Sequence, residues 1–74
     1  MSVAVTNEGG TILVDDGNSV LYIKKEKVDV SAVGTNVIIR EDSVHYRTYP
    51  ATDFTAPSGT AAQIATAIQV FLDT

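Results

Sequence analysis

The sequence predicts an α+β fold, in which a small antiparallel β-meander of five or six strands, bent or barrel-like, is covered by one C-terminal α-helix. Two observations lead to this prediction. Residues 2–49 consist of short runs rich in Val, Ile and Thr, separated by turns that contain Gly, Asn and Asp, a pattern typical of strands. The apolar residues near the C-terminus instead recur every three or four positions, which is typical of a helix.

The predicted strands follow one another between short turns. Asn7–Gly10 and Asp16–Ser19 are turn signals, because Gly adopts positive φ angles and Asn and Asp bond to their own backbone. Pro50 ends the strand region, because proline cannot donate to a ladder. The expected strands are residues 2–6, 11–15, 20–25, 27–33, 37–41 and 44–49, of which 27–33 is the weakest.

A single domain is expected over 1–74, with a linker over 50–59 and a helix over about 60–73. Thr60 and Gln63 have the spacing of a capping box, in which each side chain bonds to the backbone of the other residue. The helical spacing places four large apolar residues on one face, which we expect to be buried as the core helix face: Ile64, Ile68, Phe71 and Leu72.

Three of the predicted strands are apolar on both faces, over Ile12–Val14, Val20–Ile23 and Val37–Ile39. Successive strand residues point to opposite faces, so we expect these strands to be buried on both sides. The helix covers one sheet face. The second face is covered either by closure of the sheet into a barrel or by another chain, and the sequence leaves both outcomes open.

The composition excludes several classes of function. The chain has 74 residues, nine acidic and five basic, with a net charge of −4. Scattered acids without a basic face argue against nucleic-acid binding. The lack of Cys and the presence of one His argue against disulfides, a metal site and a bound cofactor. No signal peptide and no apolar run of about 18 residues are present, so we expect no membrane segment. A core this small favours oligomerisation or a partner chain as additional support.

Few side chains stand out as functional candidates, and none as catalytic. His45, Arg47 and Tyr49 are expected on one side of the last strand. Tyr and Arg are frequent interface anchors, so these three residues are a candidate partner contact, with an ordinary exposed strand face as the alternative. A lone His has no nucleophile to activate, and we therefore expect neither an enzyme nor a small-molecule substrate. The basic run Lys24–Lys27 is interpreted as a solvated strand end, with a contact patch as the alternative.

The segment YPATDFTAPSGTAAQIATAIQVFL, which spans the C-terminal third, resembles the ending of short virion-associated proteins of tailed bacteriophages, including the crAss-like phages. In that group a strand with a Tyr leads through an Asp-aromatic/Val-Thr-x-Pro turn to a terminal helix of Ile, Leu and small residues. The matching residues are Tyr49, Asp53, Phe54, Thr55, Pro57, Ile64, Ile68 and Leu72.

The resemblance implies a non-enzymatic structural subunit of a bacteriophage particle, a capsid- or tail-associated protein that is made in the host cytoplasm and resides in the virion. Its partners would be other virion proteins or further copies of itself, as a homo-oligomer. The alternative hypothesis is a stand-alone small binding module or regulatory protein that offers a sheet edge to a peptide partner.

Overall fold

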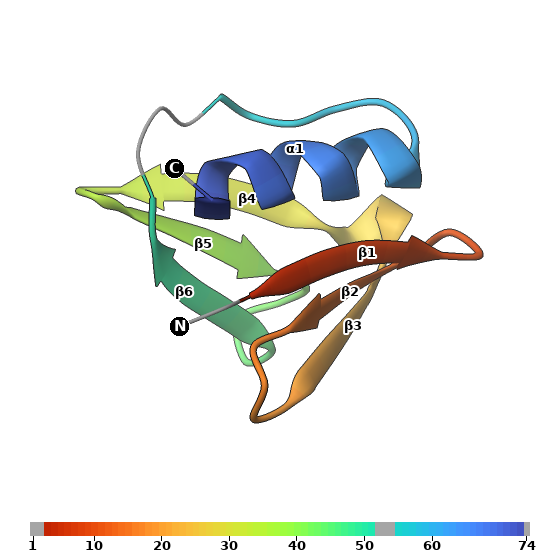
Figure 1. Cartoon of the computed structure of the whole chain (residues 1–74), viewed down its shortest axis with the longest axis horizontal. Helices are drawn as coiled ribbons and strands as arrows, with labels where there is room; N and C mark the ends of the chain where they lie inside the picture. Colours follow the sequence, from red (N-terminus) through yellow and green to blue (C-terminus); the bar gives the residue numbers. More distant parts are fainter. Residues whose placement is uncertain (1–2, 52–54, 74) are drawn as a thin grey trace.

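The computed structural model of the chain describes residues 3–51 and 55–73 and confirms the α+β class (Figure 1). Each predicted strand is present close to its expected position, and so is the helix. Asp53 and Phe54, which carry part of the resemblance, lie outside the described residues. The elements in chain order are β1 (Ala4–Glu8), β2 (Thr11–Asp15), β3 (Val20–Lys24), the 3₁₀ turn η1 (Lys25–Lys27), β4 (Asp29–Val33), β5 (Asn36–Arg40), β6 (Tyr46–Pro50) and α1 (Ala61–Asp73).

The strands form two three-stranded antiparallel sheets, and the single meander that the sequence predicted is wrong. The first sheet has the order β1-β2-β3 and the second the order β4-β5-β6, and the two are not closed into a barrel. The first ladder ends where the Lys25 N–H donates to the Gly10 carbonyl at 3.1 Å. The chain then turns through η1, where the Val28 N–H bonds back to Lys25 at 3.4 Å, and enters the second sheet without pairing β4 to β3.

The connection between β1 and β2 shows why the turns lie where the sequence predicted them. Glu8 pairs with Thr11 across a two-residue connection, Gly9–Gly10. Both glycines have positive φ angles, 59° and 91°, as a hairpin turn that matches the right-handed strand twist requires. Residues with a Cβ are strained in that conformation, so the register of the hairpin depends on this glycine pair.

A single cluster of buried side chains lies between the two sheets and α1. Inward positions alternate with outward ones along β2, β3, β5 and β6, because successive strand residues point to opposite faces. The first sheet contributes Val5, Ile12, Val14, Leu21 and Ile23, the second Val37, Ile39 and Tyr49, and the helix Ile64, Ala65 and Ile68. The inner faces of the two sheets therefore cover each other within one chain.

The expectation that three strands are buried on both sides is wrong for this chain. Leu13, Val20 and Ile38 point to the outer faces and are only half-buried. Tyr22, also on an outer face, remains 60% exposed. The continuous apolar runs are therefore inward residues of the core alternating with outward residues that the described chain covers only in part.

The helix begins with the capping box that the sequence predicted. The Gln63 N–H donates to Thr60 Oγ1 at 3.2 Å, and the Thr60 N–H donates to Gln63 Oε1 at 2.9 Å. Gly59 precedes the cap at φ 109°, and a Cβ there would collide with the Gln63 side chain. Of the expected core face, Ile64, Ile68 and Phe71 are buried and Leu72 is half-buried.

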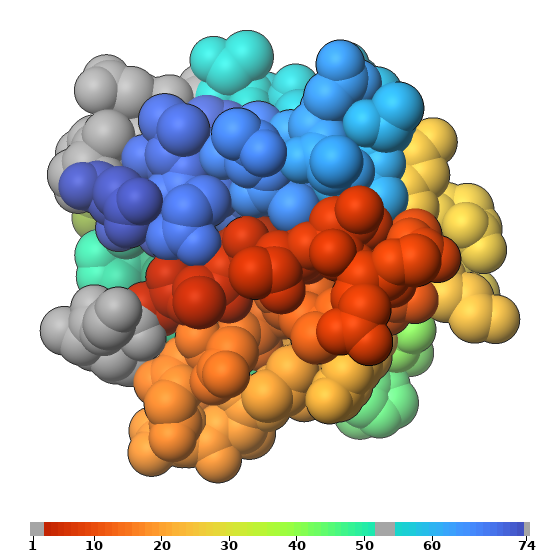
Figure 2. All heavy atoms as spheres, turned by 45° about the vertical axis from the view of Figure 1, so that its right-hand side comes forward, coloured from red at the N-terminus to blue at the C-terminus, as the bar shows by residue number. Residues whose placement is uncertain are grey.

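α1 lies directly alongside β1, as both views show (Figure 2). One side chain joins the two elements. Gln69 accepts the Val5 N–H through Oε1 at 2.6 Å and donates through Nε2 to the Val3 carbonyl at 2.9 Å. One residue of a parallel neighbouring strand would make the same pair of bonds through its own N–H and C=O groups, so Gln69 occupies this part of the outer edge of β1 in place of another strand.

We expect Ile68→Ala to lower the free energy of unfolding by roughly 2–5 kcal/mol, because truncation of a fully packed Ile removes apolar contacts and leaves a cavity. Ile68 is 0% exposed. A domain of this size has only about 3–5 kcal/mol from its core, so a large fraction of the variant should be unfolded. Urea unfolding followed by circular dichroism measures the change.

Val70→Ala is the matched control on the same helix, since Val70 is 55% exposed. Its urea midpoint should stay close to that of the wild type. An Ile68→Ala midpoint that does not differ from the Val70→Ala midpoint would contradict the placement of Ile68 in the core.

Candidate functional site

The structure separates His45 from Arg47 and Tyr49, the other two residues predicted as a partner contact. His45 lies in the connection between β5 and β6 and is exposed. Arg47 and Tyr49 both lie on the inner face of β6, where Tyr49 pairs with Val37 and is buried. Tyr49 is therefore a core residue and no part of an exposed stripe, which corrects the prediction for that residue. The outward side chains of β6 are those of Tyr46 and Thr48.

Arg47 and Tyr49 instead hold the second sheet to the turn between β2 and β3. Arg47 Nη2 donates to Ser19 Oγ at 2.7 Å, and Arg47 Nε lies 3.8 Å from Asp16 Oδ2. The Tyr49 hydroxyl donates to the same carboxylate oxygen at 3.3 Å. Two side chains of the turn between β2 and β3 and two of β6 thus form one polar contact, which we call the inter-sheet contact: Asp16, Ser19, Arg47 and Tyr49.

Asp16 is the centre of the inter-sheet contact. Its Oδ1 accepts the N–H groups of Asn18 and Ser19 at 3.0 and 3.1 Å. These two backbone bonds lower the pKa of Asp16, with smaller contributions from the Tyr49 hydroxyl and the Arg47 charge. Burial, followed by the negative charge of Asp16, raises the pKa of Tyr49. At neutral pH the carboxylate is therefore ionised and the phenol is neutral, which is the pairing that the hydrogen bond requires.

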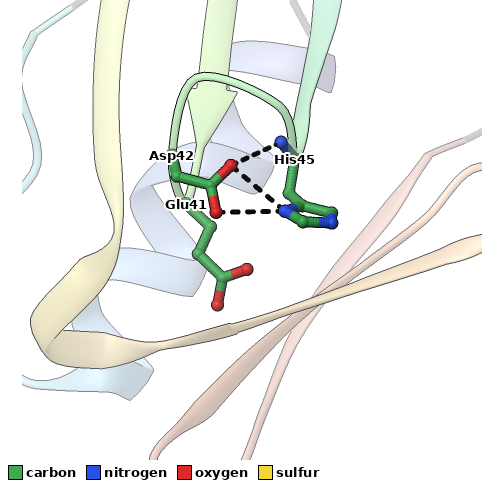
Figure 3. Close-up of side chains that lie close together, drawn as sticks. All are labelled: Glu41, Asp42 and His45. Atoms are coloured by element: carbon green, nitrogen blue, oxygen red, sulfur yellow. Dashed lines mark hydrogen bonds and ion pairs between the residues drawn. The ribbon is translucent and has the colours of Figure 1, made fainter.

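A second polar cluster lies in the loop between β5 and β6 (Figure 3). Asp42 Oδ1 accepts the N–H groups of Val44 and His45 at 2.8 and 2.7 Å. Its Oδ2 lies 3.0 Å from Nδ1 of the His45 ring. One carboxylate thus shapes the loop and orients the imidazole, and the Glu41 N–H closes the loop on the His45 carbonyl at 2.9 Å.

The two partners shift each other's pKa in opposite directions. The bond to His45, with the backbone N–H groups of His45 and Val44, lowers the pKa of Asp42 to about 2. The bond to Asp42 and then its charge raise the pKa of His45. The His45 contribution to stability is fully present below about pH 6.5 and disappears as the pH rises through the raised pKa. The Asp42 contribution is present above about pH 3.9 and disappears as the pH falls through its lowered pKa.

Glu41, Asp42 and His45 are also three potential metal ligands, with one ligand atom each within 4.8 Å of the others. These three residues were not predicted as a group, although their Glu-Asp-x-x-His spacing is visible in the sequence. His45 and Asp42 side chains are 60% and 50% exposed, and the Nδ1 atom of His45 is already bonded to Asp42. The arrangement is that of an exposed, loop-stabilising ion pair.

The outward side of α1 carries a shallow hollow of about 350 Å³, lined by Ala62, Gln63, Thr66 and Ala67. The lining side chains carry no charge, and all except that of Gln63 are short. Ala62 is exposed, whereas Ala65 on the opposite side is buried. Of the alanines in the helix, Ala65 is therefore one that brings α1 close to the strands, and Ala62 instead leaves space on the surface.

Comparison with protein-family models, with curated proteins and with solved structures finds no match for this chain. Over residues 3–51 and 55–73, no helix is long and apolar enough to cross a membrane.

We expect His45 to titrate above its usual pKa of about 6.5, because its proton is stabilised by Asp42. His45 is the one histidine of the chain, so the Hε1 resonance in an NMR titration reports it without overlap. In Asp42→Asn the pKa should fall towards 6.5. In Glu41→Gln, the matched loss of one negative charge, the change should be smaller, because Glu41 is the weakest of the contributions. A pKa of His45 below 6.5 in the wild type would refute the prediction that Asp42 stabilises the protonated ring.

Absence of tight metal binding remains a prediction from the sequence, and the Glu41–Asp42–His45 cluster is the place to test it. One equivalent of Zn²⁺ should leave the His45 ring resonances unshifted at pH 7, because exposed ligands stay hydrated and Nδ1 is engaged. Elemental analysis after dialysis checks the same point independently. Zinc retained at one equivalent, and lost in His45→Ala, would show the prediction to be wrong.

Proposed function

We propose that this protein is a small non-enzymatic structural subunit of a bacteriophage particle that acts through protein–protein contacts. The observation that carries the proposal is the distribution of exposed large apolar side chains over both sheets. Tyr22 is 60% exposed on the first sheet and Tyr46 is 49% exposed on the second. Other large apolar residues exposed at the surface are Val33, Val44 and Val70.

Such side chains are suited to contacts with other proteins. Tyr is enriched in interface cores because its ring supplies contact area and its hydroxyl supplies a hydrogen bond. The exposed residues come from β3, β4, β6, the loop before β6 and α1, so they are spread over the surface. A subunit with neighbours on several sides requires such a distribution, whereas one small ligand requires convergence on one cavity.

The particle as the setting rests on the resemblance of the C-terminal third to small virion proteins. Tyr49, Ile64 and Ile68, which carry part of that resemblance, are all buried. These three shared residues therefore serve the fold, and contacts with neighbouring subunits would be made by the outer faces and the sheet edges.

A stand-alone binding module that offers a sheet edge to a peptide is the second candidate. It is favoured by the outer edge of β3, because among the described strands β3 pairs only with β2. A free strand edge of this kind accepts an extended peptide through main-chain hydrogen bonds. Such a module would be monomeric until the peptide is added, and would not sediment with particles.

The test is purification of particles from the native source on a density gradient, followed by quantitative mass spectrometry. We expect peptides of this protein in the particle band, in constant proportion to the major virion proteins and retained after a high-salt wash. Recovery of the protein exclusively in the fractions without particles would contradict the proposed setting.

A further inference from the structure

The edge strands of the two sheets differ in whether residues of the described chain bond or block their outward backbone N–H and C=O groups. In an antiparallel ladder, alternate residues direct their N–H and C=O groups to opposite sides, so one known bond identifies the outward residues of each strand. On β1 the Val5 N–H points outward and is taken by Gln69. That edge is therefore already occupied by a side chain of the same protein.

The outer edge of β6 ends in a proline. Bonds from Ala51 N to Thr35 O and from Glu41 N to His45 O show that odd-numbered residues of β6 face β5. Tyr46, Thr48 and Pro50 therefore face outward. Pro50 has no N–H to donate, which is a common protection of edge strands.

The outer edge of β4 offers fewer groups. Since odd-numbered residues of β5 bond to β6, the even-numbered ones bond to Asp29, Ser31 and Val33 of β4. That leaves Val30 and Ala32 as the outward residues of β4. Val30 is already partly buried against the core cluster.

The outer edge of β3 presents three outward residues in succession. Lys25 N bonds to Gly10 O, so the odd-numbered residues of this segment face β2, and Val20, Tyr22 and Lys24 face outward. None of them is proline, and Tyr22 and Lys24 are exposed. The edge is symmetric about Tyr22, with one outward residue two positions to either side.

We propose that β3 is the contact between two copies of this chain, paired antiparallel about a two-fold axis at Tyr22. This inference rests on the proposed function, that the protein acts through protein–protein contacts, and names the partner and the surface. Tyr22 then pairs with Tyr22 of the second copy, and Val20 pairs with Lys24 of the second copy. Outward residues meet outward residues throughout, so each pair exchanges two N–H···O bonds.

The side chains on the outer face are complementary in the same register. The rows across the first sheet are Ala4–Asp15–Val20, Thr6–Leu13–Tyr22 and Glu8–Thr11–Lys24. Pairing at β3 joins the two middle rows into one apolar row through Tyr22 and Leu13 of both copies. Cross-strand aromatic pairs of this kind stabilise sheets.

The charges also match in this register. Lys24 of the second copy lies beside Val20 and two strand spacings, about 10 Å, from Asp15, within the combined reach of the two side chains. Among the described residues Lys24 has no ion pair within its own chain. The two-fold axis repeats the acid–base approach on the other side, so an edge lysine, which usually discourages pairing, is compensated here.

Sedimentation of the full chain from micromolar to millimolar concentration tests the contact. We expect a monomer–dimer equilibrium for the wild type. Tyr22→Pro should abolish the dimer, because it removes an outward N–H and no bond to β2. Thr48→Pro is the matched control at an outward position of β6 and should leave the dimer intact. Circular dichroism establishes that both variants are folded.

Charge reversal gives a second, milder pair of variants. Lys24→Glu should weaken the dimer about tenfold, because opposite-charge contacts at two symmetric places become repulsive. Lys25→Glu changes the same charge one residue further on, where the backbone faces β2, and should have little effect. If Tyr22→Pro does not fold, the comparison of Lys24→Glu with Lys25→Glu decides whether β3 forms the dimer contact.

Hydrogen exchange on the wild type locates the contact directly. The amides of Val20, Tyr22 and Lys24 should become protected as the concentration rises, whereas those of Leu21 and Ile23 are protected throughout.

A wild type that remains monomeric at millimolar concentration overturns the proposal. A dimer indifferent to both Tyr22→Pro and Lys24→Glu overturns it as well, and in either case recovery of the protein in particles would still support the proposed function. A monomer whose β3 amides are protected only by an added extended peptide would assign the edge to a different partner and refute the homodimer.

Discussion

The aliphatic layer between the two sheets is the interaction on which the rest of the structure depends. Each sheet has three strands and one apolar inner face, and a sheet of this size needs packing on that face for stability. Ile12, Ile23 and Ile39 are fully buried in the shared layer. The chain has no cysteine, so no disulfide supplements this packing. The two sheets and α1 contribute to one core cluster, so the stabilities of the two sheets are linked.

Polar contacts at the margins set how the two sheets and the helix meet around this layer. Gln69 joins α1 to β1 through two backbone bonds. The inter-sheet contact joins β6 to the turn after β2 through Asp16, Arg47 and Tyr49. Hydrophobic burial is non-directional, whereas these bonds have defined lengths and angles. Dispersion and burial thus hold the layers together, and the marginal bonds select one arrangement. Because the pKa of Asp16 is lowered, this contribution to stability is present at neutral pH and declines as the pH falls below about 3.9.

Local patterns in the sequence were sufficient for the elements and insufficient for their long-range arrangement. The capping box and the helical period predicted α1, and the glycine pair predicted the first hairpin. The break between β3 and β4 was missed because Lys24–Lys27 contains no Gly, Pro or Asn to mark it. Tyr49 was misplaced because the side of β6 that carries His45 and Arg47 is the more polar one. Pairing with Val37 and Ile39 turns that side inward, and a register of this kind depends on residues distant in sequence. The spacing of Asp42 and His45 is visible in the sequence, but an Asp and a His in a loop do not by themselves predict a contact between their side chains.

Chain length limits how many sheet edges a protein can protect with its own residues. A 74-residue chain buries only about 60% of the surface that its unfolded form exposes. Two separate sheets have more edges than one closed barrel, and each protected edge requires its own device. Here the β1 edge is occupied by Gln69 of a thirteen-residue helix, and the β6 edge ends in Pro50. Within the described residues, the outer edge of β3 has neither device, and of its two exposed outward residues, Tyr22 and Lys24, Tyr22 is large, mostly apolar and capable of hydrogen bonding. An edge of that composition is an aggregation hazard for a free monomer, and it is consistent with a fold that reaches its full coverage in an assembly.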